Sequence, residues 1–359
     1  MRVLSAQRRE HILAALEEQS FVSVTVLAEE FSVSRMTVRR DIAALEAEGL
    51  VSAVRGGATR RPPEGTGATP AAGTRGGVGV IVPVADYYYW PILDAARETL
   101  SGQGFDMSVM VSGYDRESER RIADQMLDSG AQCLIIAPTF DQESIAGGDH
   151  EWLYGLPAPV VLLERELPAT RDGRTVSSVR TAYETGWERA GRELRSLGHE
   201  RVALVTHGLR QIGVDLDRVW ERAAERAGFE RAGAVTVVDA RLTGSPAQGV
   251  LDEVIGRIRK AEVTAVVSHC DQATLGLVHA MRRRGMSIPD DLSIVTNEDE
   301  VAQMTTPALT SCSPATHVIG RQAARLALDL LDGDGAPVQH VRVEPSLTKR
   351  SSCRPPAAR

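Results

Sequence analysis

The sequence predicts an α/β protein in which a small three-helix head precedes a larger body of two similar lobes, each a doubly wound parallel sheet. Three observations lead to this prediction. Capped apolar helix patterns fill residues 8–58, a segment rich in Pro and Gly follows, and short apolar strands then alternate with helices of about 10–15 residues. We therefore divide the chain into a head, a flexible linker, a body and a disordered tail, at residues 1–59, 60–77, 78–350 and 351–359.

Charge is distributed unevenly along the chain. Residues 1–61 carry nine arginines and eight acidic residues, whereas the whole chain has a formal net charge of −7. An acidic body argues against wrapping nucleic acid over the whole surface, so such a contact must come from a local patch. Residues 1–13 carry charges where a signal peptide needs an apolar core, and no run of roughly eighteen apolar residues occurs. We expect a cytoplasmic protein without a transmembrane helix.

Three helices are expected in the head. The first covers residues 7–18, and Ser23 caps a short second helix. Ser34 caps the third, whose apolar residues recur at i, i+4 and i+7 and must face the core: Val38, Ile42 and Leu45. Gly49 ends this helix, a small wing strand follows over residues 50–55, and Gly56-Gly57 turns the chain away.

The polar side of the third helix has the composition of a DNA-reading surface. Arginine binds guanine O6 and N7 through two hydrogen bonds, and Thr37 can contact a phosphate or a thymine methyl group. The competing interpretation is that Arg35, Arg39 and Arg40 only solvate an exposed helix face. For the helix this interpretation is disfavoured, because the helix lengths, the capping residues, the glycines and the basic face all point to a DNA-binding domain. For Arg55, a simple linker charge stays an alternative.

Residues 8–58 resemble the DeoR-type winged helix-turn-helix, most specifically in VSxxTVRRDIxxLExxGL and the closing RGGA. In that family the arginines after the helix start and the wing contact DNA. The resemblance and the helix pattern together give the expected DNA-binding set: Ser34, Arg35, Met36, Thr37, Arg39, Arg40 and Arg55.

The body alternates strands and helices throughout. There are too many units for one compact sheet, which is why we expect two lobes. Strands are expected at 78–83, 107–111, 133–137, 160–163, 202–206, 235–238, 265–268 and 293–296, and helices at 92–102, 116–130, 184–197, 218–227, 250–261, 273–284 and 318–331. Ligands of such sheets bind beyond the carboxyl ends of the strands, where this chain places a mixture of polar, charged and aromatic residues. Carbohydrates need that mixture, because polar side chains bind their hydroxyls while aromatic rings cover their apolar faces.

The body resembles the LacI-type sensor domain, which shares the type I periplasmic-binding-protein fold. The resemblance spans residues 77–331 and is most specific in APVVLLERELP, TAYETGWERAGRELRSLGHERVALV and AVVSHCDQATLGLVHAMRRRGMSIPDDLSIV. It departs from the family at Cys270 and at residues 296–299, the helix around Arg218 lacks the usual glycine, and the LacI-type head with its hinge helix is absent. Carried over by position, the expected ligand-binding residues are Asp86, Tyr89, Trp90, Arg165, Arg218, Asp271 and Glu298.

Several of these positions have a structural alternative. Arg165 can form an ion pair between the lobes, and Asp271 can cap the helix expected from residue 273. Tyr87 and Tyr88 can serve packing alone, and His207 is more consistent with a structural role than with ligand binding.

These residues predict a transcription regulator, expected to be a repressor. Its partners are expected to be double-stranded operator DNA, a sugar-like effector and a second copy of itself as a homodimer. The alternatives are a DeoR-like regulator that answers a phosphosugar, or a sugar-processing enzyme. No GxGxxG after the first strand, phosphate loop, GxSxG or HExxH motif supports an enzyme, so we expect no catalytic residue, cofactor or metal.

Overall fold

The computed structural model divides into two compact units, Met1–Gly67 and Ala68–Arg359, which we describe separately. The residues that it describes are 5–18, 21–24, 27–28, 31, 33–47, 50–54, 57–60, 74–205, 216–229, 234–237, 255–256, 260, 263–269, 271–333 and 336–356. Most of the second helix of the head and most of the helix expected at 250–261 lie outside these residues.

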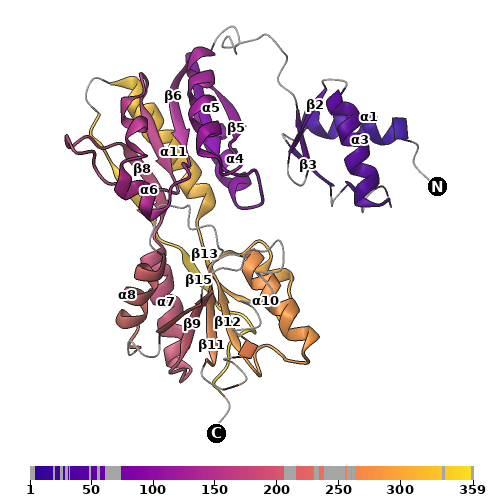
Figure 1. The fold of residues 1–359 in the computed structure, drawn as a ribbon, viewed down its shortest axis with the longest axis vertical. Coiled ribbons are helices and arrows are strands. Elements are labelled where there is room, and N and C mark those ends of the chain that lie inside the picture. Colours follow the sequence, from indigo (N-terminus) through magenta and orange to yellow (C-terminus); the bar gives the residue numbers. More distant parts are fainter. Residues whose placement is uncertain are drawn as a thin grey trace. The chain divides into compact units, whose positions relative to one another are not determined.

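The first unit is a helical head with a small antiparallel sheet (Figure 1). Its elements are α1 (Ser5–Glu18), β1 (Phe21–Ser23), α3 (Arg35–Ala47), β2 (Val51–Val54) and β3 (Gly57–Arg60). Strand β3 lies between β1 and β2 and pairs with both. The sequence located only β2, because strands of three or four residues carry too little alternation to be recognised alone.

The predicted apolar stripe of α3 is confirmed. Val38, Ile42 and Leu45 are at most 3% exposed and pack in one core with Ile12 and Leu16 of α1. This packing places the opposite face of α3 outward.

A buried ion pair also joins α1 and α3. The Arg8 guanidinium lies 2.7 Å from the Asp41 carboxylate, and the Ser5 hydroxyl donates to the same carboxylate. Together with the apolar stripe, these contacts hold α3 against α1 in one rotation about its own axis.

The second unit has two lobes. Lobe 1 is built around a parallel sheet with the strand order β14-β8-β7-β6-β4-β5. Helices α4 and α11 cover one face of this sheet, and α5 with α6 covers the other (Figure 1). Its elements are β4 (Gly76–Val82), α4 (Tyr89–Ser101), β5 (Phe105–Val111), α5 (Arg116–Asp128), β6 (Ala131–Ile136), α6 (Gln142–Gly147), β7 (Val160–Leu163), β8 (Ser177–Thr181), α11 (Thr316–Asp332) and β14 (His340–Val343).

Lobe 2 repeats this architecture with the order β10-β9-β11-β12-β13-β15, in which only the β13–β15 pair is antiparallel among the described strands. Helices α7 and α8 cover one face and α10 the other. Its elements are α7 (Tyr183–Ser196), β9 (Val202–Val205), α8 (Leu216–Arg226), β10 (Ala234–Val237), β11 (Ala265–Ser268), α10 (Asp271–Arg283), β12 (Ser293–Thr296), β13 (Thr310–Ser313) and β15 (Ser346–Thr348). The predicted pair of doubly wound parallel sheets is thus confirmed.

The chain passes between the lobes after β8, after β13 and after β14. On its return to lobe 1, α11 packs tightly along α4. A Cβ atom added at Gly320 would lie 2.1 Å from the Ile92 carbonyl oxygen, so only glycine allows this approach. Both lobes are therefore built from segments that are distant in sequence.

Two predicted boundaries need correction. The linker was expected to reach residue 77, but Gly76 and Gly77 belong to β4, and Arg75 N donates to the Gly104 carbonyl. Residues 61–73 of the expected linker lie outside the described residues.

The expected disordered tail is wrong for residues 351–356, which pack against lobe 2. Ser352 is fully buried, its hydroxyl accepts from Thr310 N and donates to the Ile294 carbonyl, and its own carbonyl accepts from Ile294 N. The tail thus supplies hydrogen-bond partners to Ile294 of β12 and Thr310 of β13, at the start of the segment in which these two strands pair with each other.

Replacing Ser352 by alanine should destabilise the second unit by about 1–3 kcal/mol, because it removes the partner of the buried Thr310 N–H and leaves the Ile294 carbonyl only the weak hydrogen bond from the Cys353 thiol. Urea unfolding followed by tryptophan fluorescence measures this change. Ser351→Ala is the matched control, because the Ser351 side chain is exposed. Equal unfolding midpoints for the two variants would refute the structural role of the tail.

Candidate functional sites

The start of α3 presents the expected DNA-binding side chains in two groups. Ser34 accepts a hydrogen bond from Thr37 N at 3.1 Å, which confirms its capping role, and the two hydroxyl oxygens are 2.9 Å apart. Met36, Arg39 and Arg40 are exposed. The structure thus gives Ser34 and Thr37 a role in the helix start and leaves the other three open to a partner.

Two members of the expected DNA-binding set cannot be placed to the same detail. Arg35 is the first residue of α3, but its side chain lies outside the described part of the chain. Arg55, between β2 and β3, lies outside the described residues altogether.

In the body, the Glu298 carboxyl connects the two lobes. Glu298 follows β12 in lobe 2 and is 8% exposed. Its Oε2 accepts hydrogen bonds from the hydroxyl of Tyr87, which follows β4 in lobe 1, and from the backbone N–H of Asp271. Oε1 has no hydrogen-bond partner among the described residues. Burial raises the pKa of the Glu298 carboxyl to about 8, and the neighbouring Asp271 carboxylate adds to this shift.

Asp271 follows β11 at its carboxyl end and contacts Glu298 through its backbone N–H. It is 1% exposed, and its carboxylate accepts from the Thr296 hydroxyl and from Val301 N. Helix α10 begins at Asp271 itself, not at residue 273. The Asp271 carboxylate therefore binds the loop after β12, and the expected capping role is not what its described hydrogen bonds show.

Asp86 and Tyr89 lie on the lobe 1 side. Asp86 Oδ1 accepts from the backbone N–H groups of Tyr88 and Tyr89 at the start of α4. Burial raises the pKa of Asp86 to about 6 against these hydrogen bonds, and Glu300 adds a smaller repulsion. Tyr89 is 5% exposed and packs edge-to-face on Tyr88.

Arg165 follows β7 in lobe 1 and is 4% exposed. Its Nε donates to the Pro138 carbonyl and its Nη1 to the Glu164 carbonyl, both at 2.9 Å. The alternative of an ion pair between the lobes is wrong for this structure, because both partners are carbonyls of lobe 1. Nη2 makes no hydrogen bond with a described residue, so this buried cation keeps donor capacity for a ligand.

The two remaining expected ligand residues in the described part of the chain lie near helix starts. Trp90 is half-buried in the first turn of α4, and Arg218 is exposed near the start of α8. His207 lies outside the described residues. Electrostatic interactions link Tyr89 to Arg165 and Asp86, and Glu298 to Asp86 and Asp271. We call these five residues, Asp86, Tyr89, Arg165, Asp271 and Glu298, the cleft set.

Three further residues near the cleft set were not among the seven expected ligand-binding residues, although Glu164 directly follows an expected strand. Glu164 is buried, accepts two hydrogen bonds from Thr181 and has a positive φ of 54°. Tyr114 also has a positive φ, of 63°, and interacts electrostatically with Tyr89 and Arg165. Tyr183, at the start of α7, interacts with groups of both lobes, including Glu164 and Glu298. Strained non-glycine residues concentrate at functional sites, but no sequence pattern identifies them.

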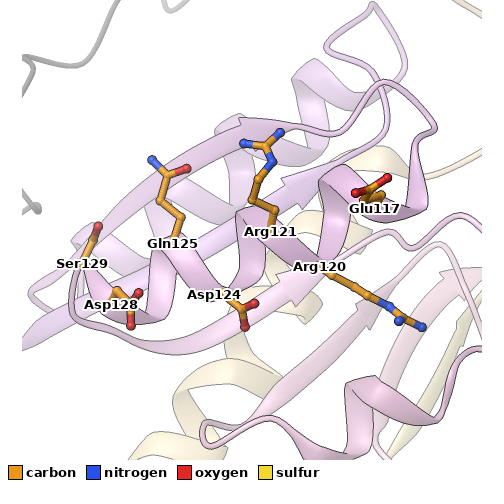
Figure 2. A pocket seen from close by; sticks show the side chains of 7 residues that line it. All are labelled: Glu117, Arg120, Arg121, Asp124, Gln125, Asp128 and Ser129. Atoms are coloured by element: carbon orange, nitrogen blue, oxygen red, sulfur yellow. The ribbon is translucent and has the colours of Figure 1, made fainter.

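Other kinds of site find less support. Among the described residues, no group of three or more His, Cys, Asp or Glu side chains can hold a metal ion, and no helix is long and apolar enough to span a membrane. A hollow of about 580 Å³ lies along α5 (Figure 2) and is lined by Glu117, Arg120, Arg121, Asp124, Gln125, Asp128 and Ser129. All seven come from one helix and its end, away from the strand ends that form ligand sites in such folds.

The raised pKa of Glu298 makes stability depend on pH. The folded protein retains a proton that the unfolded chain releases above its ordinary pKa of 4.5, so stability falls as the pH rises from 4.5 to about 8. Glu298→Gln removes this loss while its amide oxygen still accepts both hydrogen bonds. The variant should match the wild type near pH 4.5 and exceed it near pH 9 by a few kcal/mol, at about 1.4 kcal/mol per pKa unit.

Urea unfolding at the two pH values measures the effect, with Glu143→Gln, an exposed carboxylate of α6, as the control. A constant difference in stability between the Glu298 variant and the wild type at both pH values would contradict a buried protonated carboxyl.

Comparison with known proteins agrees with the two parts of the chain. Residues 8–63 match the family model of the DeoR-like helix-turn-helix domain, and residues 192–353 match that of the periplasmic binding protein-like domain. The arabinose metabolism transcriptional repressor of Geobacillus stearothermophilus is 27% identical over 315 residues, which cover 85% of this chain and 83% of the relative.

Solved structures share the fold of the second unit. A LacI family transcriptional regulator from Weissella paramesenteroides, determined with bound sucrose, has a TM-score of 0.64 and 20% identity over 78% of this chain and 99% of that chain. One from Enterococcus faecium, with bound ribose, has a TM-score of 0.59 and 21% identity over 78% and 99%. This chain therefore joins a DeoR-like helix-turn-helix domain to a periplasmic-binding-protein-like domain with the fold of the LacI-family transcription regulators.

Proposed function

We propose that this protein is a sequence-specific DNA-binding transcription regulator, acting as a repressor, whose DNA affinity is controlled by a sugar bound between the lobes. The observation that carries the proposal is the union of two features in one chain. The head exposes arginines on the outer face of α3, and the body gathers buried polar groups at the strand ends of two lobes. The similar protein of Geobacillus stearothermophilus is named as a transcriptional repressor.

DNA binding rests on Arg39 and Arg40. Both are exposed within the first two turns of α3, the part of a recognition helix that reaches base edges in the major groove. Met36, Arg35 and Arg55 complete the proposed surface, while Ser34 and Thr37 hold the helix start. A regulator of this kind works where DNA is, in the cytoplasm.

Arg39→Ala combined with Arg40→Ala should weaken binding to DNA from upstream of the protein's own gene at least tenfold, because each arginine contact is worth about 1–3 kcal/mol. Each phosphate contact that is lost should also reduce the slope of log affinity against log salt by about 0.9. Electrophoretic mobility shifts at several salt concentrations measure both effects. Arg121→Ala with Arg171→Ala is the control, since it removes two exposed arginines from the body. No shift by folded wild-type protein at low salt would refute the proposed function.

The sugar effector rests on the cleft set. The outer nitrogen of Arg165 and the protonated Oε1 of Glu298 can donate, Asp86 can accept, and Tyr89 supplies an aromatic ring, as sugar recognition requires. The phosphosugar alternative is less well supported, because four of the five residues of the cleft set are carboxylic acids or tyrosine and Arg165 is its one cation. A phosphate group would meet repulsion from the ionised carboxylates there.

Asp86→Asn should weaken sugar binding about tenfold or more, since it replaces an acceptor by a donor where a hydroxyl is bound. Its carbonyl can still accept from Tyr88 N and Tyr89 N, so the melting temperature without sugar should change little. A thermal-shift screen with arabinose, ribose, sucrose and a hexose phosphate identifies the ligand, and titration calorimetry then compares the variant with Asp329→Asn, an exposed control on α11. Unchanged affinity in the Asp86 variant would exclude this residue from the site.

A homodimer completes the proposal. Two heads related by a two-fold axis would read half-sites about one helical turn of DNA apart, near 34 Å. Closing of the lobes on the sugar would then change how the dimer spaces its heads. Sedimentation velocity tests this part, and a monomer at micromolar concentration, both alone and on DNA, would contradict it.

A further inference from the structure

A large apolar side chain lies at the centre of the outward face of α3. Met36 is 64% exposed. At about 100° per residue, it points about 150° away from the mean direction of the buried stripe formed by Val38, Ile42 and Leu45. Arg40 and Ala43, one and two turns further along, are exposed on the same ridge. The first side chain of this ridge is therefore a thioether between polar neighbours.

The orientation of this ridge is fixed by contacts on the far side of the helix. Asp41 is 5% exposed and receives hydrogen bonds from Arg8 and Ser5 of α1. Rotating α3 to hide Met36 would break this buried ion pair and expose the apolar stripe. Met36 therefore points outward in the folded head, whether or not a partner is bound to this ridge.

Two polar residues beside Met36, Ser34 and Thr37, are hydrogen-bonded to each other. The Ser34 and Thr37 hydroxyl oxygens are 2.9 Å apart, and Ser34 also accepts from Thr37 N. The exposed Met36 side chain has no hydrogen-bond donor, and its sulfur accepts only weakly. What it can recognise in a major groove is an apolar group, and the base edges there offer one, the 5-methyl group of thymine.

We propose that Met36 is a specificity-determining residue that contacts the 5-methyl group of a thymine in the operator. The inference rests on the proposed DNA-binding function and refines it. Arg39 and Arg40 supply charge and hydrogen bonds, whereas Met36 makes the head prefer thymine at one position of each half-site. Burying one methyl group against the thioether accounts for roughly a fourfold preference.

The test deletes the methyl group from the DNA and the thioether from the protein. A duplex is selected by the full-length protein from a random library, and each thymine is replaced singly by deoxyuridine, which keeps every hydrogen-bonding group. Affinities are measured by fluorescence anisotropy for the wild type and for Met36→Ala. We expect one thymine per half-site whose methyl loss costs the wild type roughly fourfold. The same replacement should cost Met36→Ala nothing.

Two variants serve as controls. Met36→Leu keeps an apolar side chain of similar size and should retain the sensitivity to deoxyuridine. Met304→Ala removes another exposed methionine, 75% exposed in the body, and should behave as the wild type. Because Met36 is exposed, its replacement should leave the circular dichroism spectrum and melting temperature unchanged.

The outcomes separate the two proposals. If the wild type binds DNA but no thymine is sensitive to methyl loss, or if Met36→Ala keeps the full sensitivity, the role of Met36 is refuted while DNA binding stands. If the folded wild type selects no duplex at low salt, the proposed function itself fails, and the inference fails with it.

Discussion

The hydrogen bond from the Tyr87 hydroxyl to the Glu298 carboxyl connects the two lobes, and the account of the body depends on it. Each residue follows an internal strand of its own sheet, β4 in lobe 1 and β12 in lobe 2. The contact therefore shows that the carboxyl ends of both sheets face a common region, which is where doubly wound folds bind ligands. The same Glu298 oxygen accepts from Asp271 N, so a ligand that competes for this carboxyl would disturb both lobes at once.

The head depends on a different constraint. The buried Arg8–Asp41 ion pair and the apolar stripe hold α3 in one rotation and turn Met36, Arg39 and Arg40 outward. In the proposed function, affinity and specificity have separate sources on one helix, since charged side chains attract any DNA whereas side chains that reach base edges select a sequence. The segment between β3 and β4 joins the two units along the chain.

Much of this architecture could be predicted from local pattern. The stripe of α3 and the strands of both sheets are runs of apolar residues whose period reveals burial. The polar segments were missed for a physical reason. Strand β8 is buried along its whole length although it contains Arg180, which is satisfied by Glu166 and Glu184. The tail residue Ser352 is buried because β12 and β13 supply its partners. Such burial depends on groups distant in sequence, and periodicity cannot reveal it.

The central claim is that the body controls the head. Its most direct test measures the affinity of the full-length protein for its operator by fluorescence anisotropy, with and without a saturating sugar that raises the melting temperature. Coupling between the sites requires the affinity to change, by fivefold or more for the roughly 1–3 kcal/mol typical of such coupling. By reciprocity, operator DNA should change the affinity for the sugar by the same factor. An operator affinity that is identical with and without the bound sugar would contradict the account.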